Sequence, residues 1–217
     1  MSRAERPADA AGAVDAGAAS GAPEPAVFVE PAVFAEPAVF ADAAAWGAWL
    51  EAHEDAHDGG WVVLAKKGTT APTSLSYQQA LEAALCSGWI DGQKRSRDAD
   101  TFLQRFTPRR ARSMWSQRNV EIIARLEAEG RLRPRGRAEV ERARADGRWE
   151  RAYAGAATMD VPEELASALA ADAAASSAFD ALSRSARYSA LHPIATAVRP
   201  ETRARRAAAL VARLREP

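Results

Sequence analysis

The sequence predicts an α+β fold: a small antiparallel sheet of three to four strands packed by helices, followed by an α-helical C-terminal appendage. Two observations predict this class. Short apolar and β-branched runs at 61–66, 89–94 and 101–106 are interleaved with helical patterns in the first two thirds of the chain. The remaining residues show apolar positions at helical spacing only. With 217 residues, 47% of them hydrophobic, the chain can bury a core.

The chain is predicted to have three parts. Residues 1–37 form an acidic, repeat-containing tail that we expect to be disordered, because 1–24 lack apolar periodicity and cannot offset the entropy of ordering. A six-residue unit then repeats through 25–42 (PAVFVE, PAVFAE, PAVFAD), with proline too frequent for a central strand. Only the last copy is expected to fold, as a short edge strand around Val39 and Phe40. An α+β domain at 38–154 and a helical region at 155–217 follow.

The helices of the α+β domain are predicted from capping residues and apolar spacing. Three helices begin after a residue that can cap them: Asp42, Ser76 and Ser116. Ser76 gives the clearest signal, because Gln79 three residues later completes a capping box. Glycines at positions 60, 88 and 130 stand where these helical patterns stop, and a fourth helix is expected at 137–146.

Two strands and the C-terminal helices complete the expected architecture. The strands at 89–94 and 101–106 flank a short polar link, which is typical of an antiparallel pair. In the C-terminal region one helix opens at Pro162, another begins at Ser177, and a final amphipathic helix starts at Pro200. Between them, Pro193 removes an internal hydrogen bond and should kink or split the helix at 188–198.

The net charge of zero conceals a segregation of charge. Residues 1–60 hold 2 basic and 11 acidic residues, whereas residues 94–151 hold 17 basic and 9 acidic ones. A basic block of this kind is either a solvated face or a surface for anions or nucleic acid. The basic residues are 26 arginines and three lysines, which, with the abundant alanine, indicates GC-rich codon usage.

The sequence contains no predicted membrane span or signal segment and only one cysteine. No apolar run approaches the roughly 18 residues of a membrane span, and no apolar segment follows the N-terminal arginines, so we expect a cytoplasmic protein. The single cysteine, Cys86, falls in an apolar helical stripe, which favours a small buried side chain over a reactive thiol. No motif implies a cofactor.

One string resembles a metal-binding motif. Residues 53–57 (HEDAH) fit the pattern H-E-x-x-H, which places two imidazoles one helical turn apart to hold zinc. The Asp-Gly-Gly turn at 58–60 ends the helix at once, and the only other histidine is His192. We therefore expect an exposed helix end and no metal site.

The candidate binding site lies in the polar strings between 89 and 119. No phosphate-binding loop, dinucleotide motif or nucleophile elbow occurs, so no catalytic residue is predicted. Guanidinium groups at 105–112 could converge on an anion, aided by the N–H groups that follow Ser116. The candidate residues are Asp91, Lys94, Arg105, Arg109, Arg112, Trp115, Ser116 and Arg118. In the alternative interpretation Asp91 pairs with an arginine, Ser116 is only a cap, and Trp89 and Trp115 are core.

These strings also resemble a known family. The bacteriocin-protection, YdeI or OmpD-associated family is similar in the order and spacing of 61–68 (WVVLAKKG), 83–92 (AALCSGWIDG), 104–109 (QRFTPR), 113–116 (SMWS), 146–149 (DGRW) and 200–206 (PETRARR). The likeness extends over about residues 40–214. It implies a role in protection against bacteriocins and antimicrobial peptides, linked to an outer-membrane porin, with no established reaction and no catalytic residues.

Three functions are compatible with the sequence. The leading hypothesis is a non-enzymatic stress or antimicrobial-peptide protection factor that acts by binding an anionic ligand or another protein. The second is an anion- or nucleic-acid-binding module that uses the arginines at 105–118 with an exposed Trp115. The third is an undescribed enzyme centred on Asp91, which requires Asp91 to face a cleft.

Overall fold

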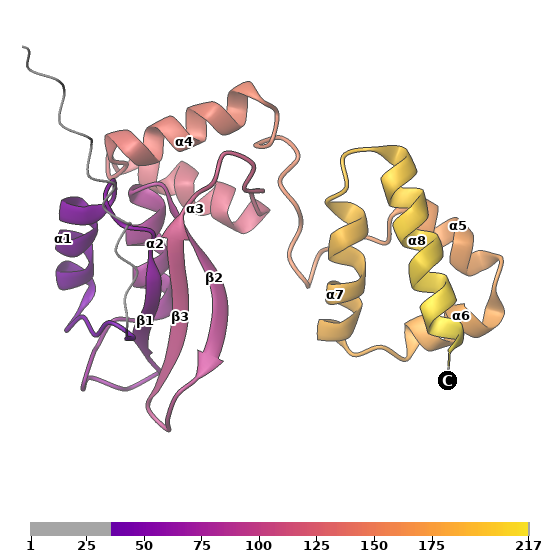
Figure 1. The fold of residues 1–217 in the computed structure, drawn as a ribbon, viewed down its shortest axis with the longest axis horizontal. Helices are drawn as coiled ribbons and strands as arrows, with labels where there is room; N and C mark the ends of the chain where they lie inside the picture. Colours follow the sequence, from indigo (N-terminus) through magenta and orange to yellow (C-terminus); the bar gives the residue numbers. More distant parts are fainter. Residues whose placement is uncertain (1–35, 217) are drawn as a thin grey trace, which may run out of the picture. The chain divides into compact units, whose positions relative to one another are not determined.

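A computed structural model describes residues 36–216 and shows a three-stranded antiparallel sheet with four helices, followed by four more helices in the C-terminal region (Figure 1). The predicted fold class is confirmed. The expected disorder at 1–37 and the first two sequence repeats lie outside the described residues, except for residues 36 and 37.

The sheet is built around its last strand in sequence. The strands are β1 (Gly60–Ala65), β2 (Trp89–Ser96) and β3 (Thr101–Pro108), in the order β1-β3-β2 with both pairings antiparallel. The predicted antiparallel pair is therefore confirmed as β2 and β3. The expected edge strand around Val39 is smaller than predicted: Ala38 forms one isolated parallel bridge with Val62, and Val39 is 48% exposed.

The helices of the α+β domain begin at the predicted caps. They are α1 (Ala43–His53), α2 (Tyr77–Cys86), α3 (Gln117–Ala128) and α4 (Pro134–Ala145). The side chains of Asp42, Ser76 and Ser116 each accept a hydrogen bond from a backbone N–H in the first turn, and the Ser76–Gln79 capping box is complete. The helix predicted at 137–146 starts earlier, because Pro134 occupies its first turn.

Two apolar clusters form the core of the α+β domain. The first packs α1 and α2 against the sheet around Trp46, Trp89 and Phe106. The second joins α2 to α3 and α4 around Leu85 and Ile123. Cys86 is buried in this second cluster, as expected, and burial raises the pKa of its thiol.

The C-terminal region contains α5 (Glu163–Ala170), α6 (Ala173–Asp180), α7 (Arg184–Ala195) and α8 (Pro200–Arg215), which share an apolar cluster of their own. Two predictions for this region are wrong. The helix expected to begin at Ser177 begins at Ala173, because the Asp172 side chain caps it by accepting from the Ala175 N–H. The split expected at Pro193 does not occur, because Pro193 lies in the last turn of α7, where only one internal hydrogen bond is lost; the alternative of a kink stays a prediction. No helix within 36–216 is long and apolar enough to cross a membrane.

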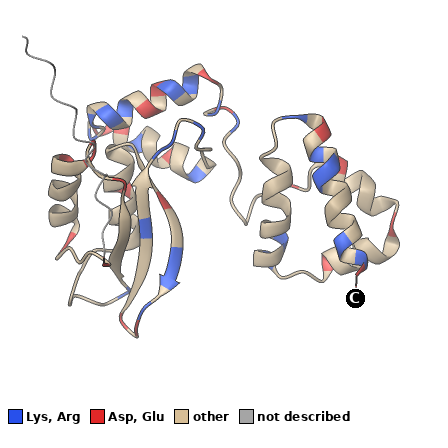
Figure 2. Cartoon of the chain, in the orientation of Figure 1, with Lys and Arg blue, Asp and Glu red and all other residues tan. Residues whose placement is uncertain are grey.

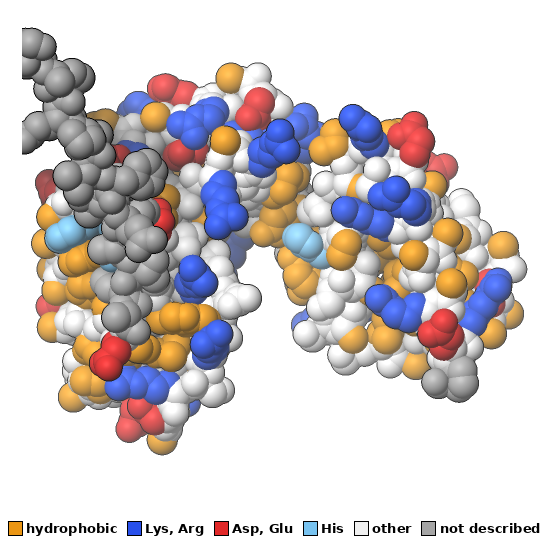
Figure 3. Space-filling view, viewed as in Figure 1, with side chains coloured by type: hydrophobic (Ala, Val, Ile, Leu, Met, Phe, Trp, Pro, Cys, Tyr) orange, Lys and Arg blue, Asp and Glu red, His pale blue; other side chains and the backbone are white. Residues whose placement is uncertain are grey.

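Ion pairs with carboxylates neutralise one part of the basic segment 94–151 and leave another part unpaired among the described residues. Every arginine from 125 to 148 lies within 4.0 Å of a carboxylate, including Glu51 and Asp55 of the acidic first segment. Helix α4 carries both acidic and basic residues (Figure 2), and side chains of both charges lie beside one another on the face shown in Figure 3. By contrast, the five arginines between 105 and 118 form no ion pair with any described residue.

Candidate functional site

A polar cavity of about 350 Å³ lies where β2 meets the start of α3. Its polar walls come from α2, β2, the α3 N-terminus, the segment after α4, and α7, which contributes Tyr188. We call it the Asp91 pocket and define it by six of its lining residues: Tyr77, Asp91, Ser116, Arg118, Asn119 and Tyr153.

A β-bulge places Asp91 in this pocket. The pairing of β2 with β3 shifts register between Asp91 and Lys94. The buried Gln104 side chain of β3 holds this irregularity, since its Nε2 donates to the carbonyls of Gly92 (2.9 Å) and Gln93 (3.2 Å). Bulges re-aim neighbouring side chains, so the local departure from regular pairing accounts for the direction of Asp91.

Asp91 is paired with a tyrosine and not with an arginine. The Tyr77 hydroxyl donates to Asp91 Oδ2 at 2.7 Å, and Asp91 Oδ1 accepts no hydrogen bond from residues 36–216. This corrects the alternative in which Asp91 pairs with an arginine. It also meets the condition for an enzyme centred on Asp91, because the carboxylate faces a cavity.

The opposite wall of the pocket is the beginning of α3. Ser116 caps the helix by accepting from the Asn119 N–H at 3.2 Å. The guanidinium of Arg118 lies over the Tyr77 ring, 5.3 Å from its centroid, and donates to Gln78 Oε1 at 2.9 Å. Tyr153 is held against this helix start by two backbone hydrogen bonds, Tyr153 N–H to the Trp115 carbonyl and Gln117 N–H to the Tyr153 carbonyl.

The tyrosines of the pocket provide a pH test. Burial raises the pKa of Tyr77, Tyr153 and Tyr188, and for Tyr77 the hydrogen bond to Asp91 adds to the effect. Because these folded-state pKa values exceed the unfolded value of about 10, the folded chain keeps protons that the unfolded chain releases. The free energy of unfolding should therefore fall as the pH rises above about 10.

We expect an ultraviolet absorbance titration of the folded protein to show tyrosine ionisation later than in a free tyrosine. The step at the highest pH should disappear in Tyr77→Phe, because burial and the Asp91 bond affect Tyr77 most. Tyrosine ionisation at the ordinary pKa of about 10, or an unchanged last step in the variant, would contradict this assignment.

Arg109 and Trp115 belong to the interior beside the pocket. Arg109 is 5% exposed, its Cζ lies 3.5 Å from the centroid of the Trp115 ring, and its Nη1 donates to the Met114 carbonyl. Burial lowers the pKa of the Arg109 guanidinium to about 10. Trp115 is 1% exposed. The expectation of an exposed Trp115 is therefore wrong: its ring is covered by the Arg109 guanidinium and packs against Trp149.

The remaining predicted residues lie away from the pocket. Arg105 and Arg109 line a separate cavity of about 260 Å³ with Arg110. The Lys94 ammonium lies over the Phe102 ring at 4.3 Å, and Arg112 is exposed in the turn before α3. The structure thus brings together Asp91, Ser116 and Arg118 of the predicted set, and adds Tyr77, Asn119 and Tyr153, which sequence reasoning missed.

The histidines of the HEDAH string do not share a helix face. Helix α1 ends at His53, whose Nδ1 lies 2.8 Å from the Trp49 carbonyl oxygen. His57 lies beyond the helix and its Nδ1 accepts from the Gly59 N–H at 2.9 Å. Over residues 36–216, no group of three or more His, Cys, Asp or Glu side chains is arranged to hold a metal ion.

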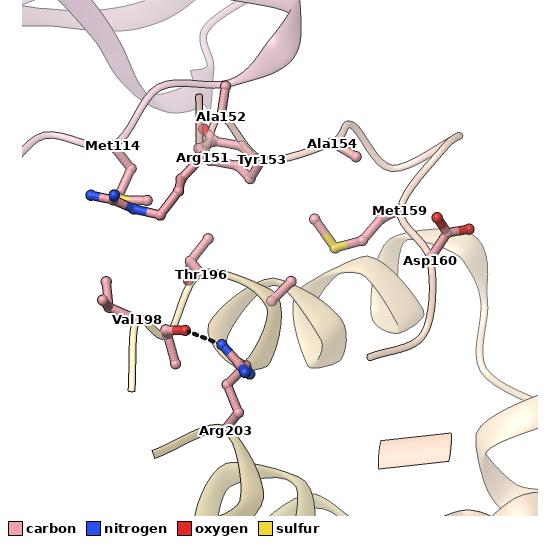
Figure 4. A pocket seen from close by; sticks show the side chains of 12 residues that line it. Met114, Arg151, Ala152, Tyr153, Ala154, Met159, Asp160, Thr196, Val198 and Arg203 are labelled. Carbon is pink, nitrogen blue, oxygen red and sulfur yellow. Dashed lines mark hydrogen bonds between the residues drawn. The ribbon is translucent and has the colours of Figure 1, made fainter. Parts of the chain in front are cut away.

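A larger cavity, of about 400 Å³, is lined by Met114, Arg151–Ala154, Met159, Asp160 and residues 195–198 with Arg203 (Figure 4). Arg203 of α8, which lines this cavity, is already hydrogen-bonded within the protein. It donates to Glu164 at 2.6 Å and to the Ala197 carbonyl at 3.4 Å. The Asp91 pocket contains a carboxylate oxygen of Asp91 and the side-chain amide of Asn119, neither of which has a hydrogen-bond partner among the described residues.

The fold and the pocket define an α+β protein with a small polar cavity beside a bulged strand and a helix start. Comparison with family models gives two matches. Residues 158–216 match "Bacteriocin-protection, YdeI or OmpD-Associated", and residues 38–139 match a domain of unknown function (DUF8412). The resemblance to the bacteriocin-protection, YdeI or OmpD-associated family is thus confirmed for the C-terminal region, where residues 158–216 match its model. Searches of curated proteins and of solved structures gave no match.

Proposed function

We propose that the protein is a non-enzymatic protection factor against bacteriocins and antimicrobial peptides that acts in the cytoplasm by binding. In this proposal the α+β domain at 38–154 binds the ligand in the Asp91 pocket. The helical region at 155–217 contains the residues that match the protection family. The observation that carries it is the match of residues 158–216 to the bacteriocin-protection family.

The chemistry of the pocket supports binding. The Tyr77 phenol is protonated at neutral pH, as any tyrosine is, and its raised pKa keeps it so in more alkaline solution, which makes it a lasting hydrogen-bond donor to Asp91. The Asp91 carboxylate keeps one oxygen free of hydrogen bonds to the described residues, so it can accept from an N–H group of a peptide. A fixed donor, a carboxylate and a guanidinium around one cavity are groups that orient a ligand.

A deletion strain should be more sensitive to cationic antimicrobial peptides and bacteriocins than its parent, and the intact gene should restore resistance. An Asp91→Asn gene should restore it only partly, because the substitution removes the charge that strengthens a hydrogen bond to an N–H donor. We expect the peptide or bacteriocin concentration that halves growth to be severalfold lower in the strain carrying Asp91→Asn than in the strain carrying the intact gene.

Glu121→Gln is the matched control, since Glu121 is an exposed acidic residue on α3 and does not line the pocket. It should protect as well as the intact protein. Unchanged sensitivity of the deletion strain would reject the proposed role, and full protection by Asp91→Asn would place the binding site elsewhere.

A second candidate is an anion- or nucleic-acid-binding module. It is favoured by the five arginines between 105 and 118, which form no ion pair with residues 36–216, whereas those from 125 to 148 are paired. Binding to nucleic acid through these side chains should weaken steeply as salt is added, because phosphate neutralisation releases counterions. A salt-independent or absent interaction with single- and double-stranded nucleic acid excludes this candidate.

A further inference from the structure

The two walls of the Asp91 pocket present opposite charges. Asp91 stands on the β2 wall, and Arg118 stands at the second position of α3 on the facing wall. They form no ion pair with each other, since the ion pairs of residues 36–216 do not include either side chain. The buried Arg109 adds positive charge close enough to interact with Asp91. A ligand with a negative group at α3 and a donor at Asp91 would match this arrangement.

The α3 wall has hydrogen-bond donors in excess. Helix α3 is 12 residues long, so its N-terminus carries the positive end of a helix dipole. The backbone N–H of Arg118 has no hydrogen-bond partner among the described residues, whereas those of Gln117 and Asn119 are satisfied by Tyr153 and Ser116. Helix starts with free N–H groups bind carboxylates and phosphates.

An independent observation at the same wall points to a ligand. Asn119 is only 6% exposed and lines the pocket, yet its side-chain amide makes no hydrogen bond with any residue of 36–216. The amide atoms are not among the fully enclosed unsatisfied atoms, so the amide opens into the pocket, where water or a ligand satisfies it. A polar ligand that enters the pocket can therefore replace that water at the amide.

We propose that the Asp91 pocket binds the free C-terminal residue of a peptide. The terminal carboxylate lies between Arg118, the Arg118 backbone N–H and the Asn119 amide, and the last peptide N–H donates to Asp91. Tyr153 and Met114 line the space for the terminal side chain. At about 350 Å³ the cavity is near the lower limit of ligand pockets, roughly 300–1,000 Å³, and it suits a chain end better than a long segment.

The inference rests on the proposed function and names the part of the peptide that is recognised. Calorimetric titration of the full-length protein with a short synthetic peptide of lysine, leucine and alanine tests it, when the same peptide is also supplied with an amidated C-terminus. We expect the free acid to bind at least about tenfold more tightly, because the charge-assisted hydrogen bonds of the carboxylate are lost in the amide.

Two variants test the assigned groups. Arg118→Ala should abolish the preference for the free acid, and Asn119→Asp should weaken the free acid specifically, because it sets a carboxylate against a carboxylate. Asn119→Asp keeps the side-chain volume, and the helix N-terminus offsets part of the cost of burying the added charge. Arg97→Ala, at the exposed β2–β3 turn, is the matched control and should keep the preference.

Equal affinity for the free and amidated peptides overturns the inference while leaving the proposed function intact. An unchanged preference in both pocket variants overturns it as well. If neither form binds, both the inference and the proposed binding role are rejected.

Discussion

Gly59→Ala is expected to lower the free energy of unfolding by about 3 kcal/mol. Gly59 has a φ of +85°, in the left-handed region that favours glycine, and an added Cβ would lie 2.0 Å from the Phe106 carbonyl oxygen and 2.7 Å from the Thr107 Cα. These are backbone atoms of β3, the central strand, so relief requires the strand or the turn before β1 to move. Urea denaturation of the purified variant would measure the loss.

Gly47→Ala is the matched control. Gly47 lies inside α1, where an added Cβ meets nothing within 4 Å. Since alanine has the higher helix propensity, this variant should stabilise the protein by about 0.5–1 kcal/mol. If the two variants unfold at the same urea concentration, the close approach of Gly59 to β3 is not a feature of the protein in solution.

Trp46→Ala is expected to lower the free energy of unfolding by about 4 kcal/mol, the second large effect. Trp46 is fully buried at the centre of the aromatic cluster, 5.6 Å from Phe106 and 5.4 Å from Trp49 between ring centroids. Its Nε1 also donates to the Ala80 carbonyl of α2 at 3.1 Å. The substitution leaves a large cavity between α1, α2 and the sheet and removes the second hydrogen bond to the Ala80 carbonyl, which lies within α2.

Trp46→Phe separates these contributions. It keeps most of the ring but loses the hydrogen bond to Ala80, so the expected loss is smaller, about 1–2 kcal/mol. Thermal or urea unfolding gives both values. A loss below about 1 kcal/mol for Trp46→Ala would mean that α1 is not packed on the sheet through this side chain.

Two different family models match two different parts of the chain, so the two parts can contribute differently to function. The protection family covers 158–216, whereas the Asp91 pocket is built mainly from residues within 38–139. The strings at 61–116 that resemble the family lie in the range of the domain of unknown function, and only the string at 200–206 lies in the range of the family model. The Asp91→Asn and Arg118→Ala experiments therefore test whether the first part supplies the binding activity.

The sequence predicted well the features that depend on neighbouring residues. A cap needs only a side-chain oxygen and an N–H three residues later, so Asp42, Ser76 and Ser116 were identified from spacing alone. The two errors in the C-terminal region were also inferences from single residues, at Ser177 and Pro193. Asp172 proved a stronger helix start than Ser177, and Pro193 was harmless because it lies in the last turn of α7.

The pocket could be predicted only in part, because its geometry depends on contacts between distant residues. Tyr77 and Asp91 meet because α2 packs beside β2, and a bulge held by Gln104 directs the carboxylate. Arg109 lay within the same arginine-rich string as Arg118, yet one guanidinium is buried on Trp115 and the other lines the pocket. The spacing of residues in the sequence does not show which of these two arginines is buried, because burial depends on which residues from other parts of the chain pack against each side chain.

The sequence by itself determined the α+β class and the three caps of the first domain, because these follow from local hydrogen bonding and the spacing of apolar residues. Its strings also showed the family resemblance. Only the tertiary structure decided that Asp91 pairs with Tyr77, that the arginines from 125 to 148 are neutralised by carboxylates, and that the Asn119 amide is left unpaired in a cavity. The physical reason is that charge pairing and polar satisfaction depend on which distant side chains become neighbours after folding.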